Sequence, residues 1–195
     1  LIILSPAIGR EITTQFQNEK YCESCGNQFQ DLYRMGFCRN CFFTSPMAGE
    51  RIIRPELSRA HEGEEDRDLA FEKGYQLQPH IVYLANSGGL KVGVTRVAQM
   101  PTRWIDQGAS EAIVFAKTSN RYEAGIIEVA MKNHVADKTV WQKMLKNEDP
   151  EMDLTAEKER LAQHLPEDLK QFLSNDNEVL RMEYPVQHYP TKVKS

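Results

Sequence analysis

The chain has 195 residues, a hydrophobic fraction of 41% and a formal net charge of −4 at neutral pH, values that suit one medium globular domain or two small ones. No apolar run reaches the roughly 18–20 residues that a membrane-spanning helix needs. The apolar start LIILSPAIG is too short for a secretory signal and no basic segment precedes it. We therefore expect a cytoplasmic protein that has no membrane partner.

Charge is distributed unevenly along the chain. Residues 1–74 carry 9 Lys and Arg against 12 Asp and Glu, residues 75–147 carry 9 against 5, and residues 148–195 carry 6 against 11. A basic section between acidic flanks suits a site that meets an anionic partner such as a nucleic-acid backbone. Chance produces an excess of this size as readily, so charge alone does not decide the function.

All four cysteines lie within residues 22–41, as two Cys-x-x-Cys pairs: Cys22 with Cys25, and Cys38 with Cys41. Each pair can present two thiolates to one ion, and four thiolates fill the tetrahedral shell of Zn²⁺ without an open position. Disulfides are disfavoured in the cytosol, and a thioredoxin-like redox motif needs one pair only. The doubled spacing therefore predicts a structural zinc site.

Aromatic side chains alternate with arginines around these cysteines. We interpret the aromatic residues as the small core that a ribbon needs around its metal, and a nucleic-acid face is the alternative. The aromatic residues are Phe29, Tyr33, Phe37 and Phe42. The next section, residues 46–79, predicts a connector, because prolines recur along it and residues 62–68 form an acidic run.

From His80 the pattern changes to short apolar segments. HIVYLA (80–85) and LKVGVT (90–95) are rich in β-branched residues, and the Asn-Ser-Gly-Gly between them supplies residues that tolerate positive φ. These features predict a β-hairpin.

Helices and strands then alternate. PTRWIDQ (101–107) predicts a short helix that ends before Gly108, and EAIVFAK (111–117) predicts a third strand. Asn120 with Glu123 resembles a capping box at the start of a helix over 121–135. Further elements are expected as short helices over 137–145, 157–165 and 166–173 and a final strand over 178–186.

Four polar side chains in this region suggest chemistry: Tyr83, Lys91, Arg103 and Glu128. Phosphodiester cleavage requires a base that activates water, cations around the developing charge, and a carboxylate that holds a divalent metal. Taken singly, Tyr83 is an ordinary strand aromatic, Arg103 a surface charge and Glu128 a solvated residue at the edge of a helix. Spacing alone does not show that the four converge.

Residues 81–128 resemble the GIY-YIG nuclease domain, with 81-IVY-83 and 91-KVG-93 in place of its two signature strands and Thr95 at the usual position. The resemblance implies that Tyr83 activates water, Arg103 stabilises the phosphate and Glu128 holds a single Mg²⁺. Ile81 replaces the first signature glycine and Lys91 the second signature tyrosine. Because lysine is a cation at neutral pH unless its pKa is depressed, Lys91 favours binding without hydrolysis as the alternative.

The run KVGVTRVAQMPTRWIDQGA, with HIVYLA before it and VADKTVWQKML after it, is similar to an uncharacterised bacterial family, domain of unknown function 2797. Its members also carry the paired cysteines, and they usually continue into further β-structure, which implies that this chain is truncated. The resemblance covers most of the chain but implies little about activity.

We therefore predict an α+β protein with a zinc ribbon-like module (1–45), a connector (46–79), a GIY-YIG-like domain (80–147) built on a three-stranded antiparallel sheet, and an acidic helical tail (148–195) that ends in a strand. The predicted function is metal-dependent cleavage of DNA or RNA, with Tyr83, Lys91, Arg103 and Glu128 as the catalytic set. Zn²⁺ would be structural, and Glu128 would hold Mg²⁺ or Mn²⁺. The alternative is an inactive nucleic-acid-binding or scaffold protein.

Overall fold

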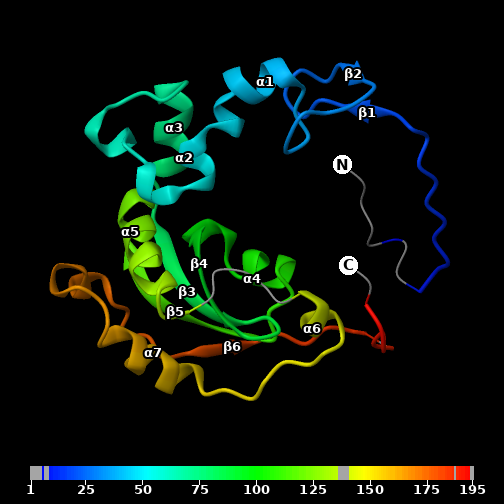
Figure 1. Ribbon diagram of the computed structural model, residues 1–195. Helices are drawn as coiled ribbons and strands as arrows, with labels where there is room; N and C mark the ends of the chain where they lie inside the picture. The colour runs from blue at the N-terminus through cyan, green and yellow to red at the C-terminus, as the bar shows by residue number, and fades with distance from the viewer. Residues whose placement is uncertain (1–5, 7–8, 136–140, 187, 194–195) are drawn as a thin grey trace. The chain divides into compact units, whose positions relative to one another are not determined.

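The structure is a computed structural model that describes residues 6, 9–135, 141–186 and 188–193 (Figure 1). Its helices and antiparallel sheets form an α+β protein. The chain divides into two compact units, residues 1–49 and residues 50–195. Among the described residues, no helix has both the length and the apolar character that crossing a bilayer requires.

The first unit is built around its cysteines. Its short strands β1 (Lys20–Tyr21) and β2 (Gln28–Phe29) pair antiparallel, and α1 (Arg39–Thr44) and η2 (Pro46–Ala48) follow. Three of the cysteines are buried together with Phe37 and Ala48. Phe29 and Tyr33, however, are exposed, so the interpretation of the aromatic residues as core is wrong for these two.

The second unit contains a four-stranded antiparallel sheet in the order β4-β3-β5-β6. The hairpin prediction is confirmed: β3 (His80–Asn86) pairs with β4 (Leu90–Arg96) through a turn in which Gly88 and Gly89 have φ of +75° and +151°. β5 (Glu111–Thr118) is the third strand. The expectation of three strands is wrong, because β6 (Val179–Arg181) from the end of the chain pairs with β5. β4 therefore forms one edge of the sheet.

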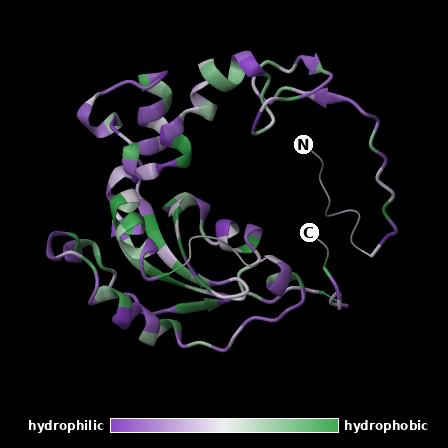
Figure 2. Cartoon of the chain, in the orientation of Figure 1, coloured by the Kyte–Doolittle hydropathy of each residue, from purple (hydrophilic) through white to green (hydrophobic). Residues whose placement is uncertain are grey.

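Helices cover both faces of this sheet (Figures 1 and 2). Because side chains alternate along a strand, Val82 and Leu84 pack against α5 (Arg121–Lys132) and α7 (Leu154–Ala162), whereas Tyr83 packs with Trp104 of α4 (Thr102–Asp106) on the other face. Two short elements also belong to this region: η5 (Val97–Gln99) and α6 (Trp141–Leu145). Of the helix predicted over 137–145, residues 137–140 lie outside the described residues, and residues 141–145 form α6.

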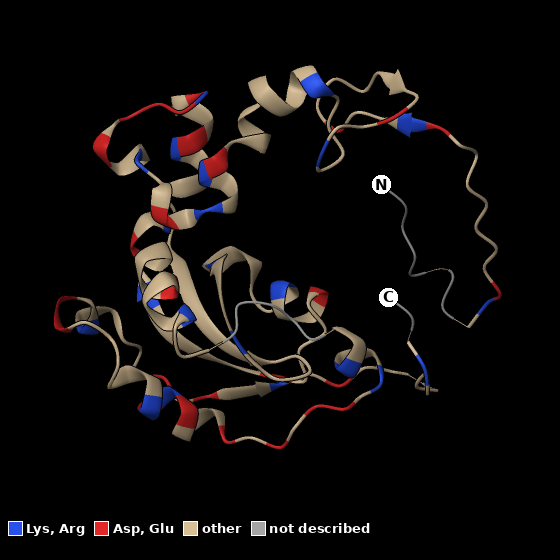
Figure 3. Ribbon diagram, in the orientation of Figure 1, with Lys and Arg blue, Asp and Glu red and all other residues tan. Residues whose placement is uncertain are grey.

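Residues 50–79 contribute α2 (Glu50–Ile53), η3 (Pro55–Leu57), η4 (Ala60–Glu62) and α3 (Leu69–Gln76). A Cβ atom on Gly125 of α5 would lie 2.4 Å from the backbone nitrogen of Glu56, so glycine permits η3 to approach this helix closely. The acidic residues of 62–68 lie on an exposed loop before α3 (Figure 3). Residues 50–79 of the predicted connector are therefore structured and belong to the second unit.

The remaining predictions concern helix ends and the tail. Asn120 caps α5 as predicted, since its side-chain oxygen accepts a hydrogen bond from the amide of Glu123 at 3.0 Å. The two helices expected over 157–173 correspond to α7 and to a 3₁₀ helix, η6 (Glu167–Phe172). The final strand is shorter than predicted and ends at Arg181.

Candidate functional site

The four cysteines form one cluster in the first unit. Their sulfur atoms all lie within 4.8 Å of one another, and they can hold a metal ion such as zinc. Burial disfavours a Cys22 thiolate, but backbone amides of Cys25, Cys38 and Ser24 outweigh this effect and lower the pKa of Cys22 to about 6. The hydrogen bond to Cys38 raises the pKa of Cys41 to about 12. The fold therefore presents at least one sulfur already biased toward the thiolate form that binds metals.

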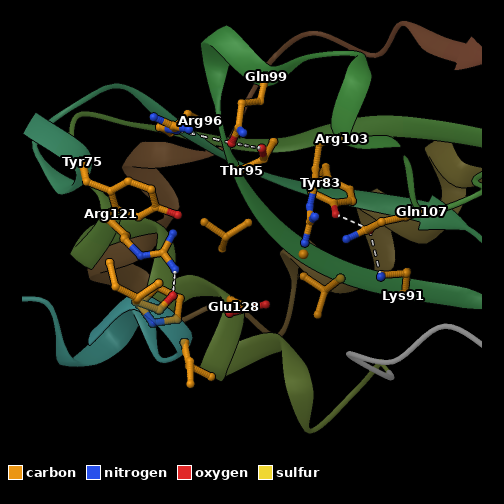
Figure 4. Close-up of a pocket in the computed structure, with 16 residues that line it drawn as sticks. Tyr75, Tyr83, Lys91, Thr95, Arg96, Gln99, Arg103, Gln107, Arg121 and Glu128 are labelled. Carbon is orange, nitrogen blue, oxygen red and sulfur yellow. Dashed lines mark hydrogen bonds between the residues drawn. The ribbon is translucent and has the colours of Figure 1, made fainter. Parts of the chain in front are cut away.

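A cleft of about 400 Å³ lies along β4 in the second unit (Figure 4). It brings together the four side chains singled out from the sequence: Tyr83, Lys91, Arg103 and Glu128. They come from β3, β4, α4 and α5, which are separate in the sequence.

The edge position of β4 explains how side chains from both faces of the sheet reach one cleft. Tyr83 stands opposite Gly93 and packs on the α4 face, whereas Glu128 belongs to α5 on the opposite face. No further strand covers β4 among the described residues. A ligand at this edge can therefore contact groups from both faces.

Gln107 joins two of the predicted residues. Its side-chain oxygen accepts a hydrogen bond from the Tyr83 hydroxyl at 2.6 Å and another from the Lys91 ammonium at 3.0 Å. Burial raises the pKa of Tyr83 to about 12, although the positive charge of Arg103 acts in the opposite direction. Tyr83 is therefore a protonated hydroxyl at neutral pH, held in a fixed orientation.

Glu128 lines the cleft with a side chain that is 13% exposed. Burial raises the pKa of its carboxyl above the ordinary value, while the charge of Lys132 lowers it. The Lys132 ammonium lies 3.6 Å from the carboxylate, one turn along α5. Glu128 thus both faces the cleft and takes part in an ion pair.

The sequence did not identify a second group of cleft residues. Tyr75 of α3 has the Arg96 guanidinium 4.9 Å and the Arg121 guanidinium 5.4 Å from its ring centre. Arg96 directly follows the second predicted strand, and Tyr75 lies in the predicted connector. No local pattern marks these residues, because Tyr75 meets the two arginines only through contacts between segments that are distant in the sequence.

The cleft is strongly cationic. Its lining contains four cationic side chains, Lys91, Arg96, Arg103 and Arg121, and one carboxylate, Glu128. Among the described residues, no carboxylate lies within 4.0 Å of the guanidinium nitrogen atoms of the three arginines. Such a surface attracts anions and suits phosphate in particular, because a guanidinium can bind two phosphate oxygens at once.

Comparison with known proteins gives one match. The model of a family described as "Protein of unknown function (DUF2797)" matches residues 9–195. No curated protein and no solved structure matches the chain.

Proposed function

The chain belongs to the DUF2797 family, and we propose that its cleft binds a phosphodiester of DNA or RNA and hydrolyses it with the help of a divalent metal. One observation carries the proposal: a tyrosine hydroxyl, several cations and a buried carboxylate face a single cleft at the open edge of β4. These are the group types that phosphodiester cleavage requires.

Each residue has a role that follows from its surroundings. Arg103 and Lys91 bind the phosphate and stabilise the negative charge that grows on its oxygens. Tyr83 orients the attacking water through its hydroxyl, which keeps its proton at neutral pH because burial raises its pKa to about 12 even with the positive charge of Arg103 beside it. Gln107 fixes both Tyr83 and Lys91.

Glu128 is the residue that would hold Mg²⁺ or Mn²⁺. Mg²⁺ is usually bound through one or two carboxylates together with water and substrate phosphate, so a single carboxylate beside a phosphate site fits this ion. When bound, the metal would polarise the phosphate and lower the pKa of a coordinated water. Glu128 must first exchange its contact with Lys132.

The same proposal covers the fold and the cysteines. We propose that residues 80–147 form a GIY-YIG-like domain, which the hairpin, the short α4 helix and the long α5 helix support. The cysteine cluster would bind Zn²⁺ as a closed structural site, because four thiolates leave no position for substrate.

Binding without hydrolysis is the second candidate, and two lysines favour it. Lys91 occupies the place of the second signature tyrosine and donates to Gln107, and Lys132 already pairs with the carboxylate that a metal would need. Such a protein would keep the phosphate site of the cleft but not the reaction.

The discriminating experiment is Mg²⁺- or Mn²⁺-dependent cleavage of labelled single- and double-stranded DNA and RNA. Wild type is compared with Glu128→Gln, and Glu159→Gln on the exposed face of α7 is the matched control. We expect cleavage by wild type and by the control, and at least 100-fold less by Glu128→Gln. Equal cleavage by all three proteins would contradict the site assignment, whereas tight binding without any cleavage would establish the second candidate.

A further inference from the structure

The cationic side chains of the cleft and the two tyrosines beside them fall into two groups (Figure 4). Arg96, Tyr75 and Arg121 gather at one end, and Tyr83, Arg103 and Lys91 lie at the other end. The proposed chemistry uses the second group and Glu128 only, which leaves the first group without a role.

The first group is built rather than accidental. Arg96 and Arg121 both contact the ring of Tyr75, at 4.9 and 5.4 Å, so the aromatic ring holds two like charges close together. Arg121 is further fixed because one of its terminal nitrogens donates to the carbonyl oxygen of Ile52 at 2.6 Å. Holding two guanidinium groups together costs free energy unless an anion offsets their repulsion.

Their hydrogen-bonding capacity is largely unused. Among the described residues, Arg96 donates from Nε to Gln99 at 3.3 Å, and Arg121 donates from one Nη, while the buried Nε of Arg121 has no partner. Each guanidinium has five N–H donors. Most of these donors therefore have no protein partner among the described residues.

We propose that Arg96, Tyr75 and Arg121 form a second phosphate subsite, which binds a backbone phosphate neighbouring the one held by Arg103 and Lys91. This inference rests on the proposed function and specifies its substrate as a polynucleotide strand that lies along the edge of β4. The strand is recognised through consecutive phosphates rather than through its bases, so the cleft favours a chain over an isolated phosphodiester.

The test measures binding, without divalent metal, of a fluorescein-labelled twelve-nucleotide single strand by anisotropy at several salt concentrations. For a single strand, the slope of log K against log salt changes by about 0.7 for each phosphate contact. We expect Arg96→Gln and Arg103→Gln each to reduce the slope by about 0.7, and the double variant by about 1.4. Tyr75→Leu, which removes the ring that holds both guanidinium groups, should reproduce the effect of Arg96→Gln.

Arg181→Gln is the matched control, because Arg181 has an 83% exposed side chain on β6 and does not line the cleft. An unchanged slope in Arg96→Gln and Tyr75→Leu, beside a reduced slope in Arg103→Gln, would overturn the second subsite and leave the proposed function intact. Unchanged slopes in all cleft variants would overturn the phosphate-binding role itself. Inorganic pyrophosphate and the unlabelled strand are also compared as competitors of the labelled strand. If pyrophosphate displaces the labelled strand at a lower half-maximal concentration than the unlabelled strand does, the two subsites belong to a free diphosphate and the proposal is overturned.

Discussion

Gly93 leaves the space that the Tyr83 hydroxyl occupies. A Cβ atom at position 93 would lie 2.6 Å from the Tyr83 oxygen and 2.7 Å from the ring carbon that carries it. The two residues are opposite each other in the β3–β4 pair, so the glycine lets the tyrosine ring cross β4 and reach its open edge. The glycine of KVG is therefore a packing requirement of the cleft.

We predict that Gly93→Ala displaces Tyr83 and breaks its hydrogen bond to Gln107. Overpacking of this kind costs about 1–3 kcal/mol of folding free energy, and strand binding should weaken along with it. Urea unfolding and anisotropy measure the two effects. The control is Gly74→Ala in α3, where a Cβ atom meets nothing within 4 Å and alanine should stabilise the helix by up to about 1 kcal/mol. Equal behaviour of the two variants would contradict the packing role.

Glu128→Gln is predicted to make the protein more stable at neutral pH. Because burial raises the pKa of this carboxyl in the folded state, the folded protein holds the proton to higher pH than the unfolded chain does. Stability is therefore lost as pH rises above the ordinary value of 4.5. Glutamine removes this loss, so the melting temperature of the variant should exceed that of wild type at pH 7, and the difference should shrink toward pH 4.

Thermal melts from pH 4 to pH 8 test this prediction, with the exposed Glu159→Gln as the control. The ion pair with Lys132 opposes the effect, but such partly exposed pairs contribute only about 0.2–1 kcal/mol. A lower melting temperature for Glu128→Gln at pH 7 would show that the ion pair outweighs burial.

The sequence predicted the hairpin and its turn because β-branched runs and the Gly88-Gly89 turn are local signals. The family resemblance, and not periodicity, gives Tyr83, Lys91, Arg103 and Glu128 their expected roles. The contact of Gln107 with two of them was not foreseen, since it depends on how α4 packs over the hairpin.

Tyr75 shows where sequence reasoning fails. It lies in a polar stretch with several prolines, which predicts a connector, whereas its place in the cleft depends on contacts with Arg96 and Arg121, which are distant in the sequence. The final strand is predicted from the sequence, but its place as the fourth strand of the sheet is not, for a related reason. β6 is short, and only its pairing with β5, far away in the sequence, marks it as part of the sheet.

Lys132→Gln is predicted to strengthen divalent-metal binding at Glu128. The ammonium lies 3.6 Å from the carboxylate and competes with a cation for its negative charge. Removing it should tighten Mn²⁺ binding several-fold, measured by calorimetry or by the Mn²⁺ resonance signal. Lys170→Gln, which alters a similar surface pair with Glu167 on η6, should leave the affinity unchanged. Identical Mn²⁺ affinities in wild type and Lys132→Gln would argue against Glu128 as the ligand.

Metal removal is predicted to unfold residues 9–49 while residues 50–195 stay folded. The buried core of the first unit consists of three cysteines with Phe37 and Ala48, which is too little apolar surface to stabilise a unit of this size without a metal. Wild type should contain one Zn²⁺ per chain by elemental analysis. After chelation, trypsin should cleave after Arg34 and Arg39, and the second unit should retain its thermal transition.

Cys22→Ser should behave like the chelated protein, whereas Asn40→Ala, an exposed substitution on α1, should retain the metal and the resistance to trypsin. Trypsin resistance at both arginines after complete removal of zinc would show that the cysteine cluster does not hold the unit together.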